Sequence, residues 1–130
     1  MMKNISVGVV AIFFMIQGTL ASEVQDAKSL LADTEAALAN GQRLFSSRPT
    51  TQMIGAHSQY MKNLMDRGRQ FQVPSKYDAC AAVGATGWSF WMHGMVARFN
   101  QDRNAEVDYT QLRARYVESV RECKAQLPKG

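Results

Sequence analysis

The fold is decided by residues 79–97, which read ACAAVGATGWSFWMHGMVA and carry no charged side chain. Asp78 precedes this stretch and Arg98 follows it. An uncharged run of this length suits either a membrane span or a helix that is buried on most sides in a small bundle. Glycine, threonine, serine and histidine dilute its apolar character, and neither flank has a cluster of basic residues. We therefore expect the buried helix.

Small residues recur along one face of this predicted helix. Gly weakens a helix by about 1 kcal/mol relative to Ala, so the glycines indicate that packing against a close neighbour stabilises it. Intervals of four and three place the following residues on one stripe: Cys80, Gly84, Gly87, Trp91, Gly94 and Arg98.

The first residues have the pattern of an export signal. Lys3 gives a positive start, residues 5–16 form an apolar and small-residue core, and residues 19–21 suit a cleavage site. We predict cleavage of residues 1–21 before Ser22, which leaves residues 22–130 in the periplasm or outside the cell with no stable membrane span. The alternative is an uncleaved N-terminal anchor, which the polar Gln17 and the short core disfavour.

Length and charge restrict the class of protein. The part after residue 21 is long enough for a single domain with one modest core. The chain of 130 residues has a formal net charge of +4, with both signs mixed in both halves. This is typical of a solvated surface, whereas nucleic-acid binding requires a concentrated basic face, so we expect no nucleic-acid partner.

The two cysteines, Cys80 and Cys123, both lie in the predicted exported part. Because export takes them to an oxidising compartment, we predict a disulfide between them. The alternatives are two unpaired buried thiols and a redox-active pair. The second alternative lacks the C-x-x-C spacing typical of redox motifs.

Heptad spacing predicts an amphipathic helix over residues 22–46. Asn40-Gly41 can end a helix, but Leu44 and Phe45 stay in phase with the apolar face, so we expect the helix to continue. A second helix is expected from a cap at Thr50 or Thr51 to about residues 68–70. The apolar face of the first helix consists of Val24, Leu31, Leu38 and Phe45.

Ser75 and Asp78 have the spacing of a capping box, which predicts a third helix that ends near Phe99. After a turn at residues 100–104, a fourth helix has its apolar face at Tyr109, Leu112, Tyr116, Val120, Cys123 and Leu127. The two cysteines are about equally far from that turn, so antiparallel packing brings them level. The predicted fold is all-α, a small antiparallel bundle of three to four helices with one disulfide.

Soft-metal ligands follow one another at intervals of four on the second helix. Met53, His57 and Met61 have thioether and imidazole donors that suit Cu(I), or the iron of a haem without a C-x-x-C-H attachment motif. Further donors are available at Met65, Met92, His93 and Met95. The alternative is that the methionines fill the core, as methionine commonly does. We favour that alternative and predict no bound metal or cofactor, zinc included.

Four aromatic residues cluster on the third helix: Trp88, Phe90, Trp91 and Phe99. A small bundle covers only part of a helix that is apolar almost all round, so something else must cover the rest. The candidates are the N-terminal helix, a second copy in a homodimer, or a foreign protein anchored on Trp88, Phe90 or Trp91. Burial in the core is the favoured alternative for these rings.

The sequence nominates no catalytic residues. His57 and His93 are its only histidines, and Glu118 and Glu122 are expected to face solvent. In architecture alone the chain resembles bacterial periplasmic immunity proteins, lysozyme inhibitors and small accessory proteins of secretion or conjugation machines. We therefore expect an exported, non-enzymatic protein that binds another protein, as an inhibitor or immunity partner or as an accessory of such a machine. The alternatives are a periplasmic copper or haem binder and a small envelope hydrolase.

Overall fold

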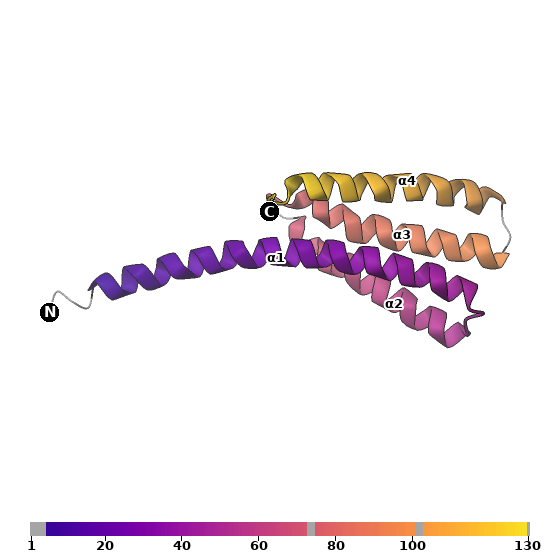
Figure 1. Cartoon of the computed structure of the whole chain (residues 1–130), viewed down its shortest axis with the longest axis horizontal. Helices are drawn as coiled ribbons and strands as arrows, with labels where there is room; N and C mark the ends of the chain where they lie inside the picture. The colour runs from indigo at the N-terminus through magenta and orange to yellow at the C-terminus, as the bar shows by residue number, and fades with distance from the viewer. Residues whose placement is uncertain (1–4, 73–74, 101–102, 130) are drawn as a thin grey trace.

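The computed structural model of the chain describes residues 5–72, 75–100 and 103–129, with side chains described from residue 22 onward except at residues 99–108. Within these ranges it has four α-helices, one short 3₁₀ helix and no strand. The helices lie side by side in an antiparallel bundle (Figure 1), which confirms the predicted fold class. Pro74, residues 101–102 of the predicted turn and the Phe99 side chain lie outside the described residues.

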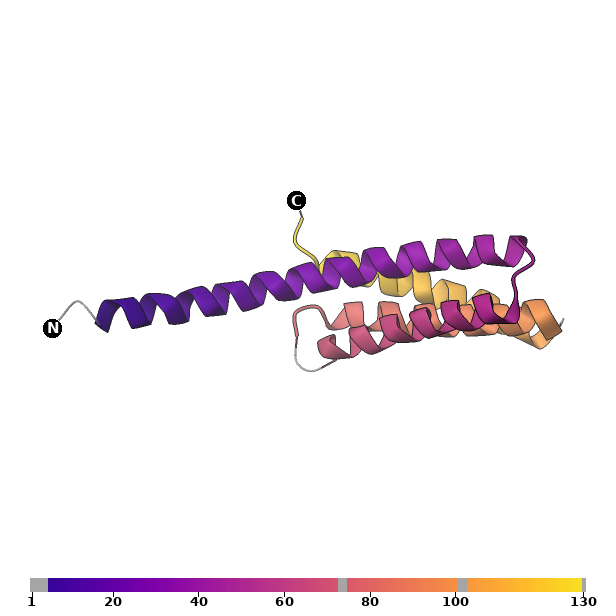
Figure 2. The ribbon, with the colours of Figure 1, turned by 90° about the horizontal axis from the view of Figure 1, so that it is seen from below.

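Helix α1 runs from Ile5 to Ser46 and continues through Asn40-Gly41, as the heptad pattern predicts. Its N-terminal part, drawn in indigo, extends beyond the other helices (Figures 1 and 2). Cleavage before Ser22 stays a prediction. The buried face of α1 consists of Ala27, Leu30, Leu31, Thr34, Ala37, Leu38 and Gly41.

Helix α2 runs from Thr51 to Gly68, and the 3₁₀ helix η2 continues it from Arg69 to Phe71. The predicted cap is confirmed at Thr50, whose side-chain oxygen accepts a hydrogen bond of 3.1 Å from the backbone N–H of Met53. Such a cap satisfies one of the N–H groups that have no partner at a helix start. The chain reverses between α1 and α2 at Arg48, which has a positive φ of 53°.

Helix α3 runs from Asp78 to Asn100 and contains the uncharged stretch. It packs most extensively against α4 and α2 and less against α1, so all three helices share in covering its apolar circumference. None of the described helices is long and apolar enough to cross a membrane.

The glycines of α3 and α2 are sites of close backbone approach. A Cβ at Gly84 would lie 2.6 Å from the carbonyl oxygen of Leu64, and one at Gly68 would lie 2.9 Å from that of Ala81. Both contacts are shorter than real Cβ atoms tolerate, so the absent side chains set the spacing between α2 and α3. The expected role of the small-residue stripe is confirmed at Gly84.

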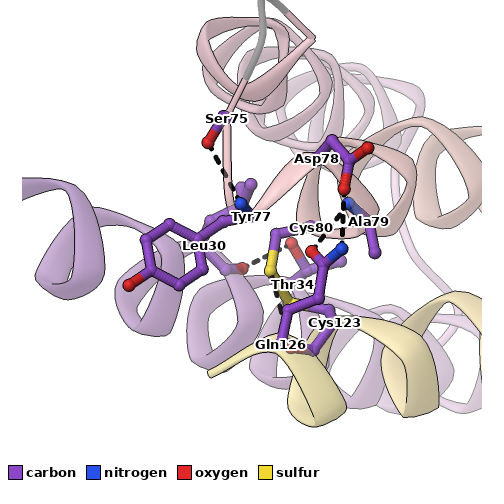
Figure 3. The surroundings of a disulfide bond; sticks show 9 residues. All are labelled: Leu30, Thr34, Ser75, Tyr77, Asp78, Ala79, Cys80, Cys123 and Gln126. Carbon is purple, nitrogen blue, oxygen red and sulfur yellow. Dashed lines mark hydrogen bonds between the residues drawn. A yellow bond between two sulfur atoms is a disulfide. The ribbon is translucent and has the colours of Figure 1, made fainter. Parts of the chain in front are cut away.

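Helix α4 runs from Arg103 to Gln126 and is joined to α3 by the Cys80–Cys123 disulfide (Figure 3). Both cysteines are fully buried. The predicted disulfide and the level placement of the two cysteines are thus confirmed.

Local capping at the start of α3 differs from the predicted pattern. Ser75 accepts a hydrogen bond from the backbone N–H of Tyr77 (3.1 Å) and donates one to Glu23 of α1. Gln126 of α4 instead spans the first turn of α3 (Figure 3). Its side-chain oxygen accepts from the N–H of Ala79 (2.9 Å), and its NH₂ donates to the carboxylate of Asp78 (2.6 Å). A residue distant in sequence therefore does part of the capping.

Candidate functional site

The candidate site is a groove between α1 and α4. Both helices pack on α3, but in the part of the chain that the structure describes they make few contacts with each other. Two adjoining pockets of about 410 and 360 Å³ occupy the space between them. The first is lined by Gln42, Phe45, Gly94, Ala97, Arg98, Tyr109 and Thr110, and the second by Leu38, Ala39, Gln42, Phe90, Tyr109, Arg113, Tyr116 and Val117. We call the two together the α1–α4 groove.

Stacked aromatic rings form part of the groove. The ring of Phe90 on α3 lies nearly parallel to that of Tyr109, with centroids 4.6 Å apart, and to that of Tyr116 at 6.1 Å. Gly94, one turn after Phe90 on α3, leaves room for Tyr109, because a Cβ there would lie 2.7 Å from a carbon of that ring. The aromatic lining thus depends on a glycine beneath it.

A hydrogen bond between side chains links the two walls of the groove. The side-chain NH₂ of Gln42 on α1 donates to the hydroxyl of Tyr109 on α4 at 3.2 Å, in an exposed position. Both residues line both pockets, so this bond lies where the pockets meet. Exposed hydrogen bonds between neutral groups stabilise little, and such a bond can be exchanged for one to a bound molecule.

The charged residues among the described lining of the groove are two arginines, Arg98 and Arg113. Arg98 donates to the backbone carbonyl of Phe45 at 3.2 Å, and its guanidinium carbon lies 5.9 Å from the centre of the Phe45 ring. Arg113 on α4 is exposed and lines the second pocket. The residues described as lining the two pockets include no aspartate or glutamate. The two arginines give the described lining of the groove a positive charge.

Tyr116 combines a place in the groove lining with a buried hydroxyl. Its oxygen is shielded from solvent and has no hydrogen-bond partner among the described residues. Desolvation, with the nearby charge of Glu35 as a lesser cause, raises the pKa of Tyr116 well above its ordinary value. The carboxylate of Glu35 is itself paired with Lys124 at 3.2 Å. Tyr116 therefore stays neutral and serves as an apolar ring with a hydroxyl that has no partner.

The three residues predicted to bind a partner lie mainly inside the bundle. Phe90 is 7% exposed and Trp91 is 3% exposed, whereas Trp88 is half-buried. Phe90 is the one among them that lines the groove. Binding of a partner by these rings stays a prediction.

Trp91 forms the centre of a second cluster, between α1, α2 and α3. Its ring stacks on Phe45 with centroids 4.9 Å apart, and its indole N–H donates to the hydroxyl of Ser58 at 2.8 Å. The ring of His57 meets it edge-on at 4.5 Å. The Nε2 atom of His57 is buried and has no hydrogen-bond partner among the described residues. Burial lowers the pKa of His57, and the backbone carbonyl of Ala37 acts weakly in the opposite direction.

The predicted metal ligands occupy three different surroundings. Met53 is 46% exposed, His57 lies half-buried against Trp91, and Met61 is fully buried in the core. The three side chains thus differ in exposure, and metal binding by them stays an untested alternative. Among the described residues, no group of three or more histidine, cysteine or carboxylate side chains is arranged to hold a metal ion.

Two carboxylates on α4, those of Glu118 and Glu122, lie one helical turn apart in sequence. Both are exposed, as expected. Glu118 accepts two hydrogen bonds from the guanidinium of Arg121, one of them at 3.0 Å. That interaction lowers the pKa of Glu118. Neither carboxylate lines the α1–α4 groove. The arrangement is that of a solvated ion pair.

Comparisons with protein-family models, with curated proteins and with solved structures found no match to this chain. The groove residues Gln42, Arg113 and Val117 were not singled out by the sequence patterns. Val117 is an apolar residue that falls off the buried stripe of α4 and is 58% exposed. That departure from the stripe was the one available signal for a binding surface on this side of α4.

Proposed function

We propose that this chain is an exported, non-enzymatic protein that binds another protein through the α1–α4 groove. It acts as an inhibitor or immunity partner, or as an accessory of a secretion or conjugation machine, in the periplasm or outside the cell. The observation that carries the proposal is the groove itself, an open surface lined by Phe90, Tyr109, Tyr116 and two arginines.

The chemistry of the groove supports protein binding. Tyr, Phe and Arg are enriched where protein surfaces meet, and truncation of Tyr or Arg often costs the most binding energy. Val117 adds an exposed apolar side chain at the rim. Apart from the groove, the N-terminal export pattern and the disulfide support a location in an oxidising compartment.

The test combines localisation with partner capture. Cells that produce the chain are fractionated, the N-terminus of the exported form is sequenced, and the protein is recovered after mild cross-linking. We expect a start at Ser22, a paired Cys80–Cys123 and a stoichiometric protein partner. The Val117→Asp variant should lose the partner, whereas Tyr60→Asp, which alters an exposed aromatic on α2, should keep it. A chain retained in the cytoplasm, or an exported monomer without a partner, would contradict the proposal.

A further inference from the structure

We infer that the partner segment received by the α1–α4 groove is an acidic amphipathic helix, with apolar side chains on the aromatic lining and a carboxylate on Arg113 or Arg98. The inference rests on the proposed function and adds the chemistry of the partner to it. Four features support it: the dimensions of the groove, its apolar lining, its charge, and the backbone requirements of a bound peptide.

The dimensions fit about two turns of helix. The α4 wall extends from Tyr109 to Val117, which corresponds to about 12 Å along the axis at 1.5 Å per residue. The α1 wall covers a similar stretch, from Leu38 to Phe45. An amphipathic helix laid in an apolar groove is a common mode of recognition, with anchors at positions i, i+3 or i+4, and i+7.

The lining offers apolar contacts along this length. Leu38 and Val117 lie at the end with the second pocket, and Phe45 and Ala97 lie at the end with the first. Phe90 and Tyr109, stacked at 4.6 Å, lie between them as a rigid pair. Rigid rings lose little conformational entropy on binding, so they suit an interface better than flexible side chains would.

The charge of the groove lining indicates the charge of the partner segment. Arg98 and Arg113 line the groove, and no described lining residue is acidic. Two acidic residues close in sequence to the lining already have partners, Glu35 with Lys124 and Glu118 with Arg121, while the side chain of Asp108, next to Tyr109, lies outside the described residues. A carboxylate from outside therefore meets arginines that are not neutralised by these side chains, and Arg–carboxylate pairs form strong, directed hydrogen bonds.

The backbone of the bound segment is the fourth consideration. The described residues form no sheet, so an extended peptide would find no strand edge with which to pair its N–H and C=O groups. A helix satisfies these groups internally and can enter an apolar groove without leaving them unpaired. The exposed Gln42–Tyr109 bond can open to give one polar contact at the centre.

The experiment places a photo-reactive benzoylphenylalanine at Val117 in the full chain, in the cells that produce it. The matched control places the same residue at Tyr60, which is exposed to a similar degree on α2. We expect a protein adduct from Val117 and none from Tyr60, with the cross-linked peptide mapping to an acidic amphipathic segment. Circular dichroism and the oxidised state of the cysteines confirm that each variant is folded.

Charge reversal then tests the arginines, with the mapped segment synthesised as a peptide. Arg113→Glu should weaken binding of this peptide at least tenfold, and exchange of its acidic residues for lysine should restore binding to that variant. Arg115→Glu, on the same helix but outside the groove, should change affinity less than twofold.

Each other outcome overturns the inference. An adduct from Tyr60 but not from Val117 would leave a protein-binding function and remove the groove as its site. An adduct at Val117 that maps to a basic segment, or to a second copy of this chain, would overturn the acidic helix while the groove remains an interface. The absence of any adduct at both positions would overturn this inference and the proposed function together.

Discussion

The His57 ring packs edge-on against Trp91, with ring centroids 4.5 Å apart, and this contact joins α2 to the centre of the bundle. Burial in this position lowers the pKa of His57 below its ordinary 6.5. The unfolded chain therefore takes up the proton at a higher pH than the folded chain does. As pH falls through 6.5, the free energy of unfolding decreases, and this loss levels off once the folded-state pKa is passed.

A neutral substitute at position 57 should remove this pH dependence. His57→Gln will be less stable than the wild type at about pH 8, because it loses the ring contact, but its stability will fall less between about pH 7 and pH 5. Urea unfolding at several pH values measures the difference. His93→Gln, which alters an exposed histidine, is the control and should follow the wild type. Parallel curves for His57→Gln and the wild type would refute the prediction.

The Cys80–Cys123 disulfide should account for a large share of the stability. It closes a loop with a sequence separation of 43, for which the chain-entropy model gives about 4 kcal/mol. We expect the Cys80→Ala/Cys123→Ala double variant to melt lower by on the order of 15–30 °C. Thermal melts followed by circular dichroism, with and without reductant, measure the shift. The double variant should not respond to reductant, and a wild type that does not respond either would contradict the prediction.

Substitution of alanine for glycine should lower the free energy of unfolding at Gly84 of α3 and raise it at Gly55 of α2. Gly84→Ala forces a methyl group against the backbone of Leu64, so we expect a loss of about 1–3 kcal/mol from overpacking. Gly55 has nothing within 4 Å of its Cβ position on α2, so Gly55→Ala should add about 1 kcal/mol through helix propensity alone. Chemical unfolding of both variants is the measurement. Equal effects would show that α2 and α3 are not in close contact at Gly84.

Removal of the Tyr116 hydroxyl should be neutral or stabilising. Because this buried oxygen has no hydrogen-bond partner among the described residues, Tyr116→Phe relieves its desolvation, by about 1 kcal/mol. Tyr109→Phe is the matched variant on the same helix and loses the exposed bond to Gln42, which should cost less than about 1 kcal/mol. Unfolding free energies decide the sign. A clear loss of stability in Tyr116→Phe would mean that the hydroxyl has a partner.

The helices and the disulfide could be predicted because local signals specify them. The heptad residues Leu31 and Leu38, the Thr50 cap and the level positions of Cys80 and Cys123 each act through spacing along the chain. The start of α3 shows the limit of that approach. There Gln126, from the far end of the next helix, accepts a hydrogen bond from the N–H of Ala79, and Ser75 accepts one from the N–H of Tyr77 where a capping box would use that of Asp78.

The groove could not be predicted, because periodicity identifies the apolar side of a helix and not which two helices stay apart. Phe90 and Trp91 are neighbours on a helix that is apolar nearly all round, so the sequence does not separate their roles. In the structure Phe90 stacks with Tyr109 of α4, while Trp91 stacks with Phe45 of α1. The methionine and histidine pattern of α2 was likewise ambiguous, since the same spacing suits core packing and metal ligation.

Gly94 sets the shape of the α1–α4 groove from beneath its surface. A single added methyl group at this position would push against the Tyr109 ring at 2.7 Å and displace it. The link to Gln42 would then break and the two pockets would merge into one trough, with every arginine left in place. Under the proposed function, a change in the volume of this one buried position would therefore alter the surface offered to a partner, without any change in the outer charges.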